Sequence, residues 1–285
     1  MLELFCKIFL EVCVMTVETL IFNVLGHDIN FISYVEEGSY GRDAALIFPG
    51  GGYENLSTER EGDAIARAYV EQGLNAFVVH YAVGKEYTYP SHLTDASFAI
   101  CYLKDNAEKY GINKDRIFTV GFSAGGHLSG SAAILHKDPD VLSALGIKKG
   151  DNRPCGAILA YPVVSAKVAT HEHSFEMLTG KPFSAITDEE KEKLSLERNV
   201  DSDSAPLFIW HTSEDPAVPM LGSLRLAEAY YGIGRHVTLH VYPYGPHGIA
   251  LANEETSCGN ESWIQPLAQG WVRDSVKWMK SLKSY

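Results

Sequence analysis

Short apolar runs alternate with amphipathic or polar stretches along most of the chain. Residues 17–24 and 29–35 alternate apolar and polar positions around Gly26-His27-Asp28, a pattern that predicts a β-hairpin. Six further strands are predicted from short, mostly apolar runs at 44–48, 76–81, 116–120, 157–161, 207–211 and 237–242. These six alternate with helical patterns, as parallel strands joined by crossover helices do. The chain therefore predicts an α/β fold with an eight-stranded, mostly parallel sheet and helices on both faces.

Capping residues and glycines mark the expected helix boundaries. Thr58 with Glu61 fits a capping box, and the helix that follows is expected to end at Gly73. Later helices are expected over residues 93–110 and 220–231 and within 263–282. Residues 136–153 are polar and irregular, so no helix is expected there.

Residues 167–203 break the alternation of strands and helices. The segment is too long for a plain loop. Thr187 with Glu190 fits another capping box, followed by a highly charged helix at 188–197. We interpret residues 167–203 as a small helical insertion at the carboxyl ends of the strands, where the ligand sites of such sheets lie.

The start of the chain precedes the predicted sheet. Residues 1–14 are apolar apart from three charged side chains spaced four residues apart, which suits a short amphipathic helix. The other interpretation, which we favour, is an upstream extension with Met15 as the natural start. Residues 15–285 are then expected to form a single domain.

One short stretch carries the strongest candidate chemistry. Gly121-Phe122-Ser123-Ala124-Gly125 follows a predicted buried strand and precedes a helix, which is the context of a nucleophile elbow. Flanking glycines tolerate the tight turn and the close approach of strand and helix. Such a turn would place the Ser123 hydroxyl over the amino end of a helix, where free N–H groups suit an oxyanion.

A serine nucleophile needs a base and a group that orients the base. In a strand–elbow–helix arrangement the chain order is serine, acid, histidine, each on a loop after a strand. Asp215 follows the strand at 207–211 and fits the acid, with Glu214 as its nearest alternative. His247 lies in a Pro-His-Gly loop just after the last strand and fits the base.

Three consecutive glycines follow the strand at 44–48, where backbone amides can approach a substrate without side-chain clashes. The amides of Gly51, Gly52 and Ala124 are expected to form an oxyanion hole. His171-Glu172-His173 invites a metal site, but no third ligand is apparent, so we expect neither a metal nor a cofactor.

The net charge and the cysteines limit the partners and the cellular location that we expect. The net charge of −12 argues against nucleic acids and anionic membrane surfaces as partners. Five scattered cysteines without a C-x-x-C pair predict no disulfide framework and a reducing, cytoplasmic location. No apolar stretch is long enough to span a membrane, and the apolar start lacks the small-residue cleavage site of a signal peptide.

Five ordered blocks resemble a bacterial α/β-hydrolase family. They are Pro-Gly-Gly-Gly-Tyr at 49–53 with Ser57 and Arg-Glu-Gly at 60–62, GFSAGGHL at 121–128, Tyr-Pro-Val at 161–163, the run at 207–215, and Gly-Pro-His-Gly at 245–248. The family is similar to acetyl esterases and to xylan or other carbohydrate acetylesterases. The resemblance implies a Ser123–Asp215–His247 triad. The resemblance is to a branch of the family that has proline at the position of Pro49. Related lipases carry histidine at that position.

The expected activity is that of a cofactor-independent serine esterase that removes acetyl or other short acyl groups from sugars or small molecules. The expected partner is a small-molecule ester, with acetylated carbohydrate as one class, and a homodimer is one expected assembly. Tyr53, with Tyr87, Tyr89 and the insertion, is expected to line the substrate pocket. Two alternatives stay open: a peptidase- or formamidase-like amide hydrolase on the same triad, and a binding protein, which the complete set of triad residues disfavours.

Overall fold

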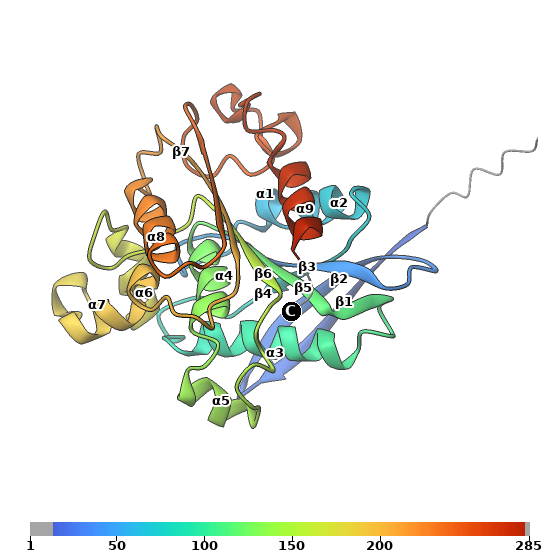
Figure 1. The fold of residues 1–285 in the computed structure, drawn as a ribbon, viewed down its shortest axis with the longest axis horizontal. Helices are drawn as coiled ribbons and strands as arrows, with labels where there is room; N and C mark the ends of the chain where they lie inside the picture. Colours follow the sequence, from blue (N-terminus) through green and yellow to red (C-terminus); the bar gives the residue numbers. More distant parts are fainter. Residues whose placement is uncertain (1–13, 283–285) are drawn as a thin grey trace, which may run out of the picture.

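The computed structural model describes residues 14–282, and the strands among them form one sheet (Figure 1). The strands are β1 (Met15–Val24), β2 (His27–Glu36), β3 (Arg42–Phe48), β4 (Asn75–His80), β5 (Ile112–Phe122), β6 (Gly156–Ala160), β7 (Leu207–Thr212) and β8 (Val237–Tyr242). Their order in the sheet is β1-β2-β4-β3-β5-β6-β7-β8. β2 is antiparallel to both of its neighbours, and all the other pairs are parallel. The predicted eight-stranded, mostly parallel sheet is confirmed.

Helices lie on both faces of this sheet (Figure 1). They are α1 (Thr58–Glu61), α2 (Asp63–Glu71), α3 (Ser91–Asp105), α4 (Ala124–Ile134), α5 (Pro139–Leu145), α6 (Glu172–Thr179), α7 (Asp188–Leu194), α8 (Leu221–Gly232) and α9 (Trp271–Ser281). One apolar core joins the sheet to α3, α4 and α8, and a second joins it to α2 and α9. On β3, Ala44, Leu46 and Phe48 belong to the first core and Ala45 and Ile47 to the second. Burial on both sides explains the continuous apolar runs of the inner strands.

Several boundaries differ from the prediction: α3 ends at Asp105 and not near residue 110, α7 ends at Leu194 and not at 197, and β5 begins at Ile112 and not at 116. β1 and β2 pair as far as Val24 and His27, so the hairpin turn is shorter than expected and His27 already lies in β2. A helix, α5, occupies part of the stretch at 136–153 that was expected to be irregular. The Asp138 carboxylate caps α5 by accepting hydrogen bonds from two of its first amides, and proline occupies its first turn.

The capping box expected at Thr58 and Glu61 is wrong. Ser57 is the N-cap residue of α1, and no side chain caps that helix. Glu61 is buried instead of pointing back along the helix. The box at Thr187 and Glu190 is confirmed at the start of α7. The difference is that Glu190 is partly exposed and can accept from both the Thr187 amide and the Lys181 ammonium, whereas Glu61 has buried donors from other segments.

Between β6 and β7 the chain forms α6, α7 and two 3₁₀ turns, η1 (Phe183–Ala185) and η2 (Leu196–Arg198). They occupy the segment interpreted as a helical insertion. Residues 1–13 of the expected extension lie outside the described residues, and the Val14 carbonyl accepts a hydrogen bond from the Glu37 amide. Within residues 14–282, no helix has the length and apolar character that a membrane crossing requires.

Candidate active site

Ser123 occupies the sharp turn between β5 and α4. Its φ of +54° and ψ of −115° are strained for a side chain with a Cβ. The neighbouring glycines make the turn sterically feasible. A Cβ on Gly121 would overlap the Gly125 carbonyl, and a Cβ on Gly125 would overlap the Phe48 carbonyl at the end of β3. The strand–elbow–helix context predicted around Ser123 is therefore present.

The structure brings Ser123, His247 and Asp215 together from three loops at the carboxyl ends of the strands. His247 Nε2 lies 2.8 Å from Ser123 Oγ, and His247 Nδ1 lies 2.6 Å from Asp215 Oδ2. An ionised carboxylate only accepts hydrogen bonds, so Nδ1 carries the proton and Nε2 is free to accept one from the Ser123 hydroxyl. Glu214, the alternative acid, is exposed to solvent.

Asp215 is buried but strongly stabilised in its charged form. Burial alone would raise its pKa, but hydrogen bonds from His211 and His247 outweigh burial and hold the pKa of Asp215 below its ordinary value. The other carboxylate oxygen accepts from the amides of Ala217 and Val218, both at 2.9 Å. The carboxylate is therefore ionised and fixed in place at neutral pH.

His211, on β7, was interpreted from the sequence only as a strand residue. Its ring is fully buried, and Nε2 lies 3.1 Å from Asp215 Oδ2 and 2.9 Å from the Val218 carbonyl. Nδ1 lies 2.9 Å from the Ser223 hydroxyl. His211 thus holds the loop that carries Asp215. Its spacing of four residues from the acid was the available signal.

The glycines after β3 form a tight loop beside the nucleophile. Gly51 and Gly52 have φ values of +127° and +67°, which favour glycine. A Cβ on Gly51 would overlap the Asn55 carbonyl, and a Cβ on Gly50 would lie 3.0 Å from Ser123 Cβ. Ala124 begins α4, so its amide belongs to the helix end next to Ser123. These are the positions at which the oxyanion donors were expected.

Glu61, which the local sequence pattern assigns to a helix cap, is a buried carboxylate. Its Oε2 accepts from the Gly50 amide at 2.7 Å, and its Oε1 accepts from the Tyr161 hydroxyl at 2.8 Å. The Tyr161 hydroxyl in turn accepts from the Ala250 amide at 3.1 Å. The Tyr161 ring meets the His247 ring edge-on, with 5.0 Å between centroids. Glu61 therefore links the glycine loop to the loop that carries His247.

A cavity of about 250 Å³ opens over Ser123 and His247. Its lining is polar side chains and glycine backbone: Gly51, Gly52, Asn55, Ser57, Arg60, Glu61, Ser123, His171, His173, His247 and Gly248. Arg60 donates to the Gly248 carbonyl at 2.5 Å and lies 4.1 Å over the Trp263 ring. The insertion contributes His171 and His173, whose spacing in the sequence suggests a metal site and not a cavity wall.

Tyr53 does not line this cavity, contrary to expectation. It is buried below the glycine loop, and its hydroxyl lies 2.8 Å from His127 Nδ1. His127 Nε2 lies 2.9 Å from the Leu194 carbonyl, so the imidazole connects the loop, α4 and α7. Tyr89 donates to Asp138, and Tyr87 packs against the His27 ring. The expected tyrosine wall is therefore absent from the cavity lining.

The paired histidines have other partners than a metal. His171 Nδ1 lies 2.9 Å from the Ser174 hydroxyl, and His173 Nε2 lies 3.0 Å from Glu54 Oε2. Burial lowers the pKa of His171, which favours its neutral form. In the described part of the chain, no three His, Cys, Asp or Glu side chains form a group that could hold a metal ion.

The fold, with its elbow at the end of β5, is that of an α/β hydrolase. The chain belongs to the BD-FAE family, whose model matches residues 42–230. That span includes Ser123 and Asp215 and ends before His247. The predicted resemblance to an esterase family is confirmed at this level.

Two curated relatives act on xylan according to their names. The chain is 35% identical to endo-1,4-beta-xylanase B of Butyrivibrio fibrisolvens over 81% of its own length and 36% of that protein. It is 29% identical to an acetylxylan esterase of Xylanibacter ruminicola, over 88% of the chain and 48% of that protein. The chain thus spans less than half the length of these two relatives.

Two solved structures match most of both chains. One is an acetyl ester-xyloside bifunctional hydrolase from Caldicellulosiruptor lactoaceticus, with a TM-score of 0.75, 31% identity, and coverage of 90% of this chain and 88% of that one. The other is the carboxylesterase Cest-2923 of Lactobacillus plantarum, with a TM-score of 0.80, 26% identity, and coverage of 93% and 97%. These matches confirm the expected class, a carboxylester hydrolase, for the stretch that they cover.

Proposed function

We propose that this chain is a serine esterase that removes acetyl or other short acyl groups, with Ser123, His247 and Asp215 as its triad. The observation that carries the proposal is the position of one imidazole, 2.8 Å from the Ser123 hydroxyl and 2.6 Å from the Asp215 carboxylate. A serine hydroxyl, a histidine base and a buried acid in this order are the minimum set for nucleophilic acyl transfer.

The proposed reaction runs through an acyl-enzyme. His247 Nε2 takes the Ser123 proton as Oγ bonds to the ester carbonyl carbon. The same proton then goes to the alcohol oxygen as the C–O bond breaks, leaving an acyl-serine. His247 next takes a proton from a water molecule as the water oxygen bonds to the acyl carbon, and it returns that proton to Ser123 Oγ as the C–Oγ bond breaks and the carboxylic acid leaves. Asp215 stays ionised throughout and stabilises the imidazolium, because its pKa is held low.

The negative charge on the tetrahedral oxygen is assigned to three backbone donors. The amides of Gly51 and Gly52 would face it from the loop after β3, and the amide of Ala124 from the first turn of α4. Donors of this kind are fixed before the reaction, so they stabilise the transition state without reorganising. The helix end adds a partial positive charge on the same side.

The cavity lining supports a polar, hydroxylated substrate with a small acyl group. Its side chains, including Asn55, Arg60 and His171, would lose their hydration against a long alkyl chain and gain no hydrogen bonds. Sugar hydroxyls both donate and accept, so they can replace that water. The names of an acetylxylan esterase and an acetyl ester-xyloside hydrolase among the similar proteins support acetylated carbohydrate as the substrate class.

The test is acetate release from acetylated xylo-oligosaccharides, run beside p-nitrophenyl esters of increasing acyl length and a p-nitroanilide. We expect acetate release and a preference for acetyl over longer acyl groups. Ser123→Ala should lower kcat by about 10⁶-fold, whereas Ser143→Ala, an exposed serine of α5, should leave it unchanged. Activity that survives in Ser123→Ala would refute the triad, and faster anilide cleavage would favour the amide hydrolase.

A further inference from the structure

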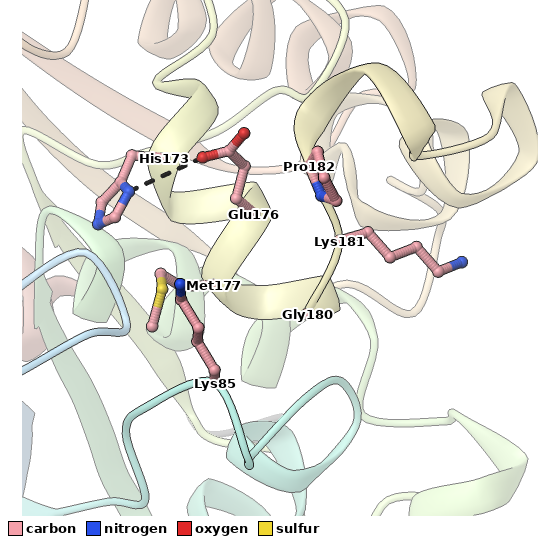
Figure 2. Close-up of a pocket in the computed structure, with 7 residues that line it drawn as sticks. All are labelled: Lys85, His173, Glu176, Met177, Gly180, Lys181 and Pro182. Atoms are coloured by element: carbon pink, nitrogen blue, oxygen red, sulfur yellow. Dashed lines mark ion pairs between the residues drawn. The ribbon is translucent and has the colours of Figure 1, made fainter.

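A second cavity lies beside the one over Ser123 and shares one wall residue with it. It measures about 230 Å³ and is lined by Lys85, His173, Glu176, Met177, Gly180, Lys181 and Pro182 (Figure 2). His173 lines both cavities. The second cavity is formed by α6, the turn that follows α6, and the loop after β4. The insertion therefore separates two adjoining compartments at one end of the sheet.

His173 is held in this shared wall from two sides. Its Nε2 lies 3.0 Å from Glu54 Oε2, just after the glycine loop. Its Nδ1 lies 3.9 Å from Glu176 Oε2, on α6 (Figure 2). A Cβ on Gly52 would lie 3.5 Å from His173 Cδ2. A substrate whose carbonyl oxygen meets the Gly52 amide therefore lies next to the His173 ring, and whatever extends past that ring enters the second cavity.

The second cavity combines an apolar floor with hydrogen-bonding groups. Met177 is buried, and the Lys85 side chain rises alongside it from the opposite loop (Figure 2). Within residues 14–282, the Lys85 ammonium forms no ion pair with a carboxylate. Lys181 is different, because its ammonium turns away in Figure 2 and pairs with Glu190. Lys85 is thus placed to donate to a ligand that rests on Met177.

We propose that this second cavity is a subsite for the neighbouring sugar ring of an acetylated oligosaccharide. The proposal rests on the proposed function, since the first compartment must hold the sugar that carries the ester. A pyranose ring presents C–H groups on its faces, which suit Met177 and Pro182, and hydroxyls at its edge, which suit Lys85, His173 and Glu176. The preferred substrate then contains at least two sugar units.

An alkyl or acyl chain is a poorer occupant of the same cavity. It would cover the Lys85 ammonium and the Glu176 carboxylate and offer them no hydrogen bond. The acyl group would instead stay within the first compartment, where the oxyanion donors hold its carbonyl. An experiment can therefore distinguish a sugar ring from an acyl chain as the occupant of the second cavity.

The first measurement is the dependence of kcat/KM on oligosaccharide length. The substrates are xylose, xylobiose and xylotriose, compared with one another at the same level of acetylation, from one to three acetyl groups. We expect about a tenfold gain from one to two sugar units and little beyond. Lys85→Leu removes the ammonium and leaves a shorter aliphatic side chain, and it should abolish most of that gain without changing p-nitrophenyl acetate hydrolysis. Lys85→Arg should restore the gain. Lys280→Leu, on the exposed face of α9, is the matched control.

The second measurement reads binding directly at Met177. The chain has five methionines. When the Ser123→Ala enzyme is labelled with ¹³C-methyl methionine, each of them gives one methyl signal. The Met177→Leu substitution identifies the signal of Met177. Xylobiose should shift the Met177 signal, whereas xylose should not. Met279, on the buried face of α9, is the internal control, and its signal should not move.

The two proposals fail in different ways. Hydrolysis of acetyl esters with no Met177 shift and no length dependence would overturn the subsite and leave the esterase intact. A Met177 response to hexanoate in place of xylobiose would also overturn it, because the cavity would then take the acyl chain. A Met177 shift with xylobiose supports the sugar subsite even if the enzyme releases no acetate, an outcome that would refute the proposed reaction alone.

Discussion

Two buried carboxylates lie at the proposed active site, Asp215 within the triad and Glu61 beside it. Asp215 accepts hydrogen bonds from two histidine rings and two amides, and those from His211 and His247 outweigh burial and lower its pKa. Among the described residues, Glu61 accepts from the Gly50 amide and the Tyr161 hydroxyl, and burial raises its pKa. The first residue is assigned to orient the base. The second contacts no reacting atom in the proposed mechanism and acts as a positioning residue for the glycine loop.

Glu61→Gln should therefore separate positioning from binding. A glutamine side chain has only one acceptor oxygen, so either the Gly50 amide or the Tyr161 hydroxyl loses its acceptor. We expect kcat to fall by about tenfold or more, with a smaller change in KM, because the loop amides would no longer be aimed at the oxyanion. Steady-state kinetics with p-nitrophenyl acetate measure both constants.

The control is Glu59→Gln, an exposed carboxylate on the same short helix. Tyr161→Phe should cause a loss similar to that of Glu61→Gln, and the double variant should add little to either, since both act through one network. Full additivity of the two losses, or a change confined to KM, would contradict the positioning role.

At the scale of elements, strands were easier to predict than the contacts between loops. The inner strands are buried on both faces, so their apolar runs are visible without knowledge of the fold. Glu61 was misassigned because Thr58 lies three residues before it, whereas its actual partners lie 11 and 100 residues away. Tyr53 looked available for the same reason: the packing of α4 and α7 above it is not encoded in its local sequence.

The positions of the proposed triad residues and of the glycines were predictable because these residues follow strands in a fixed order. His211 and His173 were not, since their roles depend on which face of β7 or α6 meets the neighbouring loop. The start of α5 could be predicted, because Asp138-Pro139 is a typical N-cap and first helical residue. The polar composition of the surrounding residues favoured an irregular segment instead.

The glycine loop gives the sharpest prediction at this scale. A side chain on Gly51 would overlap the Asn55 carbonyl, and its φ of +127° disfavours any other residue. Gly51→Val should therefore displace the proposed donors and lower kcat by about 10²–10³-fold while the far-UV circular dichroism stays unchanged. Gly38→Val is the control, since Gly38 also has a positive φ, +72°, but open space around it. Equal activity of both variants would contradict the assignment.

At the scale of the whole molecule, buried histidines make stability depend on pH. Burial lowers the pKa of His92 to about 3 and that of His127 to about 4. The unfolded chain binds these protons near pH 6.5, whereas the folded chain does not until the pH is far lower. The unfolded state thus holds more protons between about pH 6.5 and 4. Stability must fall as the pH falls through this window.

His92→Phe should flatten that dependence. Both ring nitrogens of His92 lack a hydrogen-bond partner within residues 14–282, and the ring packs against Tyr53 and Tyr81. Below pH 6, His92 should contribute about 1.4 kcal/mol per pH unit to the pH dependence of the free energy of unfolding. We expect the variant to lose this contribution. Urea unfolding at pH 5 and pH 7 measures it.

The matched variant is His236→Phe at an exposed position. It should leave the difference between the two pH values as in the parent chain. A parent chain that is equally stable at pH 5 and pH 7 would contradict the assignment of neutral, buried imidazoles.

The three proposed triad groups come from three separate loops, and His247 lies beyond β8, which stands at the end of the described sheet and pairs with β7. Cutting the chain at the exposed turn before Gly234 would leave Ser123 and Asp215 on residues 1–233 and His247 on residues 234–285. On the proposed mechanism neither fragment alone hydrolyses p-nitrophenyl acetate, and activity returns only when β8 and α9 dock again. The two fragments could therefore serve as a reporter of protein association. Each fragment would be fused to one of two proteins, and p-nitrophenol would be released when those two proteins bind each other.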